Sequence, residues 1–278
     1  MPSAAPPPMV SVRDLKVSFL SRDVVTHALK GISFDIAKGE VLCVIGESGS
    51  GKSVMMRSLL RLHHPKRTRV EGTMSVAGHQ IDSISETAMS NLRGSMISMI
   101  FQEPMTALDP LYTIGDQIAE TVRRHECCTR KQAMERALEL LELVRVPSLE
   151  RRLKAFPHEL SGGLRQRAMI AVALSCKPQL LLADEPTTAL DASVQIQVLV
   201  LLRKLQRDLG MSMIFVTHDL GVAAQIADKV AVMYDGQIVE YGTAESLLLD
   251  PQHPYTIKML ASTAKAGRHS VPRTLKHT

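Results

Sequence analysis

Aromatic side chains are scarce in this sequence: none of its 278 residues is tryptophan, and aromatic residues make up only 3% of the chain. Methionine occurs fifteen times, so we expect a core of aliphatic side chains and thioethers. Few aromatic side chains also leave few surfaces on which the bases of single-stranded nucleic acid stack. The composition therefore gives no support to binding of single-stranded nucleic acid.

Two further absences concern membranes and export. No apolar run approaches the roughly 20 residues that span a bilayer. Residues 1–8 are rich in proline and alanine and carry no basic patch followed by an apolar run, so no secretion signal is predicted. We expect residues 1–8 and the basic residues 263–278 to form flexible tails.

Cysteine occurs four times, at Cys43, Cys127, Cys128 and Cys176. These positions do not have the spacing of a zinc site, and the neighbouring pair does not form a C-x-x-C clip. The pattern predicts reduced thiols in a cytosolic protein.

The remaining bulk properties are those of a globular protein, with 45% hydrophobic and 22% charged residues. The length allows one large domain or two smaller ones. The net charge of +5 suits an anionic partner, and charge alone leaves nucleotide, nucleic acid and membrane surface open.

A glycine-rich loop follows an apolar run at residues 41–45 and precedes a predicted helix at residues 54–62. The loop consists of Gly46, Glu47, Ser48, Gly49, Ser50, Gly51, Lys52 and Ser53. Glycine lets backbone N–H groups close around a triphosphate, and the helix N-terminus adds further N–H groups. Lys52 would reach the outer phosphates, and the Ser53 hydroxyl would ligate Mg²⁺. The order strand, loop, helix favours nucleotide binding over a merely flexible Gly/Ser loop.

The hydrophobic pattern predicts an α/β fold. Alternating residues at 9–19 and 31–36 indicate an N-terminal β-rich region, and apolar strands are expected at 95–101, 179–183 and 213–217. Helices are expected at 116–146, 164–176 and 192–209, and the first of these is predicted to bury Met134, Leu138, Leu141 and Val144. Residues 231–241 are typical of a hairpin. A parallel α/β core with a helical insert arranges these elements naturally.

Several polar residues stand at the ends of predicted strands. Asp184 and Glu185 suit a Mg²⁺ ligand and a base for the attacking water, although adjacent carboxylates are also common in solvated turns. His218 either donates to the γ-phosphate or has a structural role, and Gln102 alone is weaker evidence. Phe19 is either a core residue or a platform for adenine.

These residues belong to an ordered pattern. It comprises the glycine-rich loop, Gln102, Leu-Ser-Gly-Gly at 160–163 with Arg-Gln-Arg at 165–167, the run 180–185, Ala-Leu-Asp at 189–191, and His218. The pattern resembles the nucleotide-binding subunits of ATP-binding cassette (ABC) transporters over residues 9–262.

The resemblance implies a P-loop NTPase core with an N-terminal antiparallel β subdomain and an inserted helical subdomain. It implies one domain over residues 9–262, with a core lobe at 9–101 and 177–262 and a helical insert at 102–176.

The resemblance also implies roles for single residues at one nucleotide site. Phe19 would stack on adenine, and the glycine-rich loop would hold ATP with Mg²⁺. Gln102 would sense the metal and join the core to the insert, and Asp184 would bind the metal. Glu185 would be the catalytic base, and His218 would contact the γ-phosphate.

In this family a second subunit completes each site. Ser161, Gly162 and Gly163 would face the γ-phosphate of a partner packed head to tail, so that ATP is buried in the dimer interface. Residues 189–191, with Asp191, would form a loop that crosses the interface.

Three stretches, at 100–110, 156–160 and 250–256, resemble the importer branch that serves oligopeptides, dipeptides and nickel. Leu164 stands where the familiar signature has glutamine, but the phosphate-facing residues remain. Many members continue into a cysteine-bearing tail, and this sequence has no cysteine after Cys176. We therefore expect no iron–sulfur cluster.

The predicted function is ATP hydrolysis that drives uptake of peptides or a similar small solute, by a peripheral subunit at the cytoplasmic face of the inner membrane. The implied partners are a second, identical or paralogous ATPase subunit, two transmembrane permease subunits contacted by the segment after Gln102, and an extracytoplasmic solute-binding protein. No nucleic acid is expected.

Two alternatives remain. One is an ABC ATPase acting on nucleic acid or ribosomes, although no coiled coil, zinc module or second cassette is evident. The other is a subunit that binds nucleotide without hydrolysing it, against which Glu185 and His218 argue.

Overall fold

The computed structural model of the protein describes residues 7–21, 24–188 and 190–266. Most of the two predicted tails, residues 1–6 and 267–278, therefore lies outside the described residues, as does Ala189 of the predicted interface loop. Within the described part, no helix is long and apolar enough to cross a membrane.

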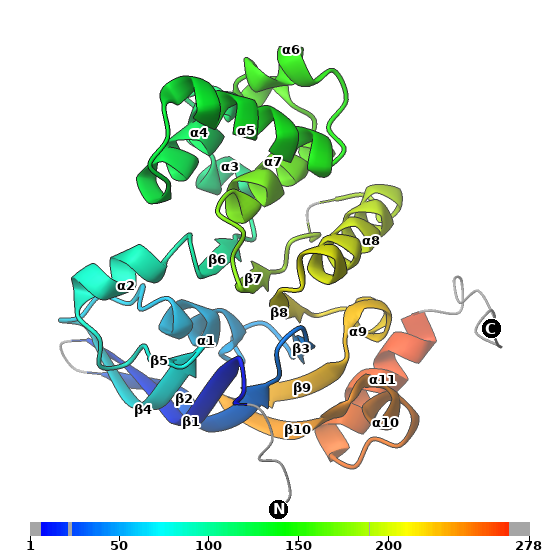
Figure 1. Ribbon diagram of the computed structural model, residues 1–278. Helices are drawn as coiled ribbons and strands as arrows, with labels where there is room; N and C mark the ends of the chain where they lie inside the picture. The colour runs from blue at the N-terminus through cyan, green and yellow to red at the C-terminus, as the bar shows by residue number, and fades with distance from the viewer. Residues whose placement is uncertain (1–6, 22–23, 189, 267–278) are drawn as a thin grey trace, which may run out of the picture.

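Two sheets form the lower part of the molecule in Figure 1. A four-stranded antiparallel sheet has the order β2-β1-β4-β5, and a six-stranded sheet has the order β10-β9-β3-β8-β7-β6. In the second sheet all neighbours are parallel except the β9–β10 hairpin. The strands are β1 (Val10–Leu20), β2 (Val25–Ile36), β3 (Val41–Ile45), β4 (Thr68–Val76), β5 (His79–Gln80), β6 (Ile97–Ile100), β7 (Leu180–Asp184), β8 (Ser212–Thr217), β9 (Lys229–Tyr234) and β10 (Gln237–Thr243).

Helices cover the six-stranded sheet and also form a separate group, α3 to α7, above it in Figure 1. The 3₁₀ turn Pro157–Glu159 precedes α7. The helices are α1 (Lys52–Leu59), α2 (Glu86–Leu92), α3 (Pro104–Ala107), α4 (Ile114–His125), α5 (Arg130–Leu143), α6 (Leu149–Leu153), α7 (Gly162–Leu174), α8 (Ala192–Leu209), α9 (Leu220–Ile226), α10 (Ala244–Leu249) and α11 (Pro254–Ala266).

Strand β3 separates two hydrophobic cores. Val41, Cys43 and Ile45 enter the core shared with α4, α5, α7 and α8. Leu42 and Val44 enter the core shared with α1 and the four-stranded sheet. Successive side chains of a strand point to opposite faces, so a strand buried on both faces is apolar throughout. The predicted α/β core with a β-rich N-terminal region is therefore confirmed.

The predicted helix at 116–146 is instead two helices, α4 and α5. The chain leaves helical geometry after His125, and Thr129 begins α5 with a capping box in which its side chain accepts from the N–H of Gln132. A capping box stabilises a new helix start, so it competes with continuation of the preceding helix.

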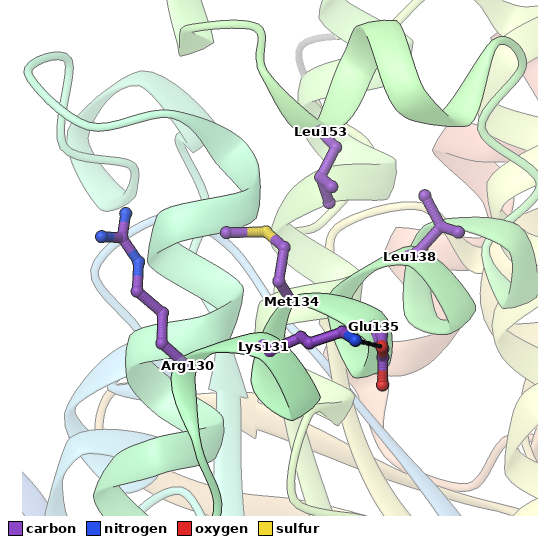
Figure 2. A pocket seen from close by; sticks show the side chains of 6 residues that line it. All are labelled: Arg130, Lys131, Met134, Glu135, Leu138 and Leu153. Atoms are coloured by element: carbon purple, nitrogen blue, oxygen red, sulfur yellow. Dashed lines mark ion pairs between the residues drawn. The ribbon is translucent and has the colours of Figure 1, made fainter.

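The buried face of α5 agrees with the prediction only in part. Leu141 and Val144 are fully buried as predicted, whereas Met134 and Leu138 are only partly buried, and Ala133, Ala137 and Leu140 are buried instead. In Figure 2 the Met134 and Leu138 side chains line a surface pocket with Arg130, Lys131, Glu135 and Leu153. Small alanine side chains let α5 approach its neighbours, which spacing alone did not indicate.

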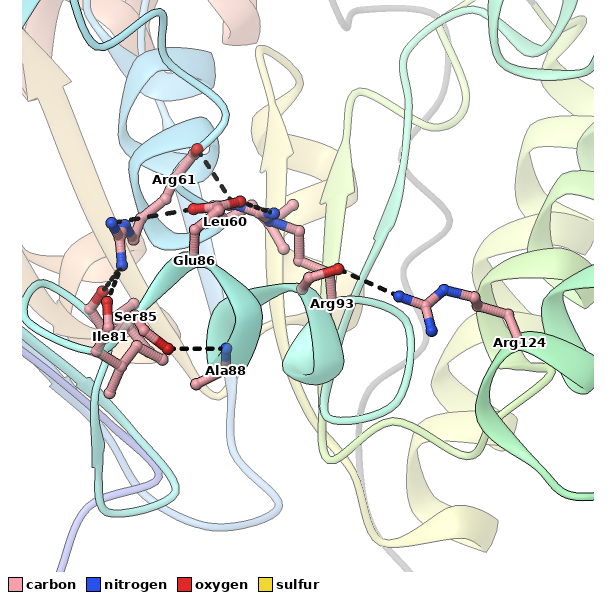
Figure 3. Close-up of polar contacts among 10 residues, drawn as sticks. Leu60, Arg61, Ile81, Ser85, Glu86, Ala88, Arg93 and Arg124 are labelled. Atoms are coloured by element: carbon pink, nitrogen blue, oxygen red, sulfur yellow. Dashed lines mark hydrogen bonds and ion pairs between the residues drawn. The ribbon is translucent and has the colours of Figure 1, made fainter.

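Arginine side chains fasten α2 to its surroundings (Figure 3). The Arg93 Nε donates to the carbonyl of Leu60 at 2.7 Å, and its Nη1 pairs with Glu86 at 2.6 Å. Across the gap to α4, Arg124 Nη2 donates to the Ser90 hydroxyl at 3.4 Å. The attachment of α2 to the core is thus stronger than this contact with the helical group.

Candidate functional site

The glycine-rich loop connects β3 to α1, as the sequence predicts. Gly51 has a φ of +103°, and a Cβ there would lie 2.7 Å from the Leu29 Cδ2 and 2.8 Å from the Ala28 carbonyl oxygen. A Cβ on Gly46 would collide with the Met233 carbonyl oxygen. Glycine is required at both positions because the loop runs directly against β2 and β9.

Lys52 lies at the centre of this loop and is only 5% exposed. Its Nζ donates to the carbonyl oxygens of Gly46 and Glu47, both at 2.8 Å. Burial lowers the pKa of Lys52, and the charges of Glu185 and Asp184 act in the opposite direction. The loop therefore holds a buried ammonium group beside the start of a helix, an arrangement that suits phosphate.

Ser53 and Asp184 meet beside the loop, although they come from α1 and the end of β7. The Ser53 hydroxyl donates to Asp184 Oδ1 at 3.2 Å. Asp184 is 4% exposed, and burial raises its pKa. In the part of the chain that the structure describes, no group of three or more His, Cys, Asp or Glu is placed to hold a metal by itself. A hydroxyl and one carboxylate nevertheless match Mg²⁺, which keeps several waters and binds phosphate oxygens.

Three polar side chains converge on the Glu185 carboxylate. Gln102 Nε2 lies 3.4 Å from Glu185 Oε2, and His218 Nδ1 lies 3.4 Å from the same oxygen. The hydroxyl of Thr188 donates to it at 3.0 Å. Sequence reasoning missed Thr188, although a hydroxyl three residues after an acidic residue in a turn is a usable signal.

Glu185 also has an unusual backbone, with a φ of +44°. Residues other than glycine adopt this left-handed region at a cost of about 1–3 kcal/mol, and such conformations cluster at functional sites. Here the conformation ends β7 sharply and directs the carboxylate toward Gln102 and His218.

The loop and the converging side chains line one pocket of about 380 Å³. Its lining residues are Ala28, Ser48, Gly49, Gly51, Lys52, Ser53, Val54, Gln102, Glu185 and His218. In the same loop the Ser50 Oγ is buried and has no hydrogen-bond partner among the described residues. Buried polar atoms are normally paired, so Ser50 is an exception, and it is not among the residues that line the pocket.

Phe19 does not appear among the residues lining that pocket. Its ring is partly buried and meets the His63 ring edge-on, with centroids 5.7 Å apart. The assignment of Phe19 to adenine stays a prediction.

The predicted signature residues also lie apart from the pocket. Ser161 precedes the first residue of α7, is exposed, and makes no side-chain cap hydrogen bond. Gly162 is exposed as well, and a Cβ on Gly163 would meet Val194 Cγ1 at 2.8 Å. Asp191 caps α8, because its carboxylate accepts from the N–H groups of Ser193 and Val194 at 3.1 and 3.0 Å. Their roles at a partner's site remain predictions.

Comparison with known proteins identifies the class to which this site belongs. Residues 29–188 match the ABC transporter family, which covers the glycine-rich loop, Gln102 and Glu185. The chain belongs to this family and is an ABC-type ATPase, so the predicted family, fold and activity are confirmed.

Its relatives include named transport proteins. The chain is 49% identical over 255 residues to the oligopeptide transport ATP-binding protein OppD of Bacillus subtilis (strain 168), covering 91% of this chain and 71% of that protein. It is 46% identical over 258 residues to the dipeptide transport ATP-binding protein DppD of the same organism, covering 92% and 77%.

A solved structure gives the same fold. The dimeric, post-hydrolysis structure of the ATP-binding cassette MJ0796 bound to ADP and Pi has a TM-score of 0.76 and 28% identity, covering 85% of this chain and 99% of that chain.

Proposed function

We propose that this chain is the ATP-hydrolysing subunit of a membrane importer for peptides or a similar small solute. The names of its relatives support the substrate class. The observation that carries the proposal is the convergence of Gln102, Thr188 and His218 on the Glu185 carboxylate, in the pocket lined by the glycine-rich loop.

We assign the residues of the pocket to two tasks, of which the first is binding. Lys52 and the loop N–H groups would bind the phosphates, and Phe19 would stack on adenine. Ser53, Asp184 and Gln102 would hold Mg²⁺, which supplies neutralisation of charge on the phosphate oxygens when it is bound.

The second task is activation of water. Glu185 would accept the proton of the attacking water, and such a base contributes typically 10²–10⁴-fold to a rate. Gln102, Thr188 and His218 keep its carboxylate at one place in the pocket. His218 would also turn its exposed ring toward the γ-phosphate, since its side chain is 60% exposed.

We propose that two subunits form each complete site. Exposed Ser161 and Gly162, with Gly163, present a helix N-terminus with no ligand from their own chain, which suits the γ-phosphate of a partner. Residues around Asp191 would cross the interface. The partner would be an identical or paralogous cassette.

Two transmembrane permease subunits and an extracytoplasmic solute-binding protein would complete the importer, placing this chain at the cytoplasmic face of the inner membrane. The exposed apolar side chains Met105, Leu111 and Tyr112, which follow Gln102, support a permease contact there. Charge reversal at Glu103 and Asp109 should impair assembly with the permease; intact assembly and transport would remove this contact from the proposal.

We further propose that residues 9–262 act as one domain, with core segments 9–101 and 177–262 and the insert 102–176 between them.

The first test is ATP hydrolysis by the purified chain as a function of protein concentration. The rate per subunit should rise with concentration, because two subunits complete each site, and Lys52→Ala should be inactive throughout. Turnover by Lys52→Ala equal to that of the unmodified chain would contradict the proposed site. A rate per subunit independent of concentration would contradict the composite dimer.

A further inference from the structure

The last helix, α11, reaches back to the glycine-rich loop through Tyr255. The hydroxyl oxygen of Tyr255 accepts a hydrogen bond from the backbone N–H of Glu47 at 3.1 Å, across 208 positions of sequence. The ring lies against Tyr234 of β9, with centroids 4.5 Å apart and planes inclined by 39°. The C-terminal part of the chain therefore touches the phosphate-binding loop directly.

Hydrogen bonds from the β9–β10 hairpin to the segment before α11 hold Tyr255 in position. The Glu240 carboxylate of β10 accepts from the N–H groups of Gln252 and His253, at 2.8 and 3.1 Å. His253 Nδ1 then accepts from the N–H of Tyr255 at 3.2 Å. Hydrogen bonds to a charged acceptor are stronger than neutral ones, so the start of α11 is held firmly.

The same hairpin supports the other end of the loop. The N–H of Gly236, in the hairpin turn, donates to the Ser50 carbonyl at 3.1 Å. The loop is thus held at Ser50 by the turn and at Glu47 by the helix that this hairpin positions.

The contact with Tyr255 acts on one peptide group that Lys52 also holds. Lys52 Nζ donates to the Gly46 carbonyl, and Tyr255 accepts from the Glu47 N–H, and these two groups belong to the same peptide bond. A peptide bond is planar, so a hydrogen bond at each end fixes the orientation of the whole plane. Without the Tyr255 hydroxyl the plane is free to rotate and carry the Gly46 carbonyl away from the ammonium.

We propose that Tyr255 is a positioning residue for nucleotide binding: its hydroxyl orients the Gly46–Glu47 peptide and thereby keeps Lys52 where the phosphates bind. The inference rests on the proposed nucleotide site at this loop. It gives the segment 250–256, which resembles the importer branch, a physical task.

The test compares two tyrosines of one ring pair in the full chain. Tyr255→Phe keeps the ring and removes the hydroxyl. Tyr234→Phe is the matched control, because the Tyr234 hydroxyl has no hydrogen-bond partner among the described residues. The measurements are equilibrium affinity for ATP with Mg²⁺, KM and kcat, and the thermal midpoint of each variant.

We expect Tyr255→Phe to weaken ATP affinity and raise KM by about threefold to tenfold, the effect of one lost hydrogen bond, with a smaller change in kcat. Tyr234→Phe should stay within about twofold of the unmodified chain. Glu240→Gln, which leaves one good acceptor for two N–H groups, should shift affinity in the same direction by less. This variant also covers the case in which Tyr255→Phe does not fold.

Four outcomes are decisive. Equal affinity of Tyr255→Phe, Tyr234→Phe and the unmodified chain overturns the inference, and so does an equal loss in both variants, because ring packing would then explain it. Unchanged affinity in Lys52→Ala would instead refute the nucleotide site itself. Loss of binding in Lys52→Ala alone, with Tyr255→Phe and Glu240→Gln unaffected, refutes only the role of Tyr255.

Discussion

The N-termini of α1 and α7 both lie next to glycine residues, but their surroundings differ. At α1, Lys52 is buried and bonded to its own loop, and Ser53 is bonded to Asp184. At α7, Ser161 and Gly162 are exposed, and the Ser161 side chain makes no cap hydrogen bond. Both ends can bind an anion by the same physics. On the proposed function, the first would bind its ligand within one chain and the second would contact a ligand bound to a partner subunit.

The strongest test concerns the site at the N-terminus of α1, here called the closed end, and uses Glu185→Gln. This substitution keeps the shape of the side chain and removes the base. Turnover should fall on the order of 10²–10⁴-fold, while ATP affinity stays near that of the unmodified chain. Steady-state hydrolysis and equilibrium binding measure the two quantities. Glu245→Gln, at an exposed carboxylate of α10, is the control. Unchanged turnover would remove Glu185 from the role of base.

The exposed N-terminus of α7, here called the open end, is tested by Ser161→Ala. We expect hydrolysis at high protein concentration to fall roughly 10- to 100-fold, the scale of losing an oxyanion-type donor, while ATP binding by dilute protein is unchanged. Ser148→Ala is a matched control because Ser148 also precedes a helix without a side-chain cap hydrogen bond. Weaker ATP binding in dilute Ser161→Ala would show that the two ends are not separate.

A smaller effect is expected on stability, from the buried carboxylate of Asp184 at the closed end. Burial raises the folded-state pKa of Asp184 above its ordinary value of 3.8. Below pH 3.8 the carboxyl is protonated in both the folded and the unfolded state. As pH rises from there to the folded pKa, the unfolded chain is ionised before the folded one, so the free energy of unfolding falls. Asp184→Asn should therefore raise the free energy of unfolding without nucleotide or Mg²⁺, on the order of 1 kcal/mol at pH 7.

The gain in Asp184→Asn should shrink toward pH 4, as measured by urea unfolding at both pH values. Asp208→Asn, at an exposed carboxylate of α8, should show no such change. A gain of equal size at both pH values would rule out the buried charge as its cause.

The smallest expected effects concern stability, and they compare the attachment of α2 to the core with its contact to the helical group α3 to α7. Arg93→Gln removes the donor to the Leu60 carbonyl and the pair with Glu86, so we expect a loss of about 1–3 kcal/mol of unfolding free energy. Arg124→Gln removes only an exposed 3.4 Å contact to Ser90 and should stay within about 0.5 kcal/mol. Chemical denaturation of both variants measures the difference. Equal losses would mean that the helical group is held as tightly as α2.

Features encoded by neighbouring residues were predictable. The loop between β3 and α1, the strand before Asp184 and the hairpin turn all depend on short-range patterns, and the structure places them as expected. The order of motifs added the family and hence the overall fold. The pattern could not show the break after His125, because a capping box and a continuing helix compete and only tertiary packing decides between them.

Long-range contacts of the site were not predictable. The approach of Tyr255 to Glu47 depends on how the β9–β10 hairpin places α11, and no local signal encodes it. The same holds for the edge-on contact of Phe19 with His63, since spacing does not tell a core face from a ligand face. Sequence therefore identified the candidate residues of the site, and tertiary packing determined which neighbours restrain them.

Burial of β3 on both faces has a mechanical consequence. The strand enters two cores and is hydrogen-bonded to β8 and β9, so we expect it to open only on global unfolding. The glycine-rich loop thus begins at a strand that should move little. On the proposed function, movement that accompanies ATP hydrolysis would leave the site through other segments, such as the one that begins at Gln102, and those segments would be displaced relative to β3.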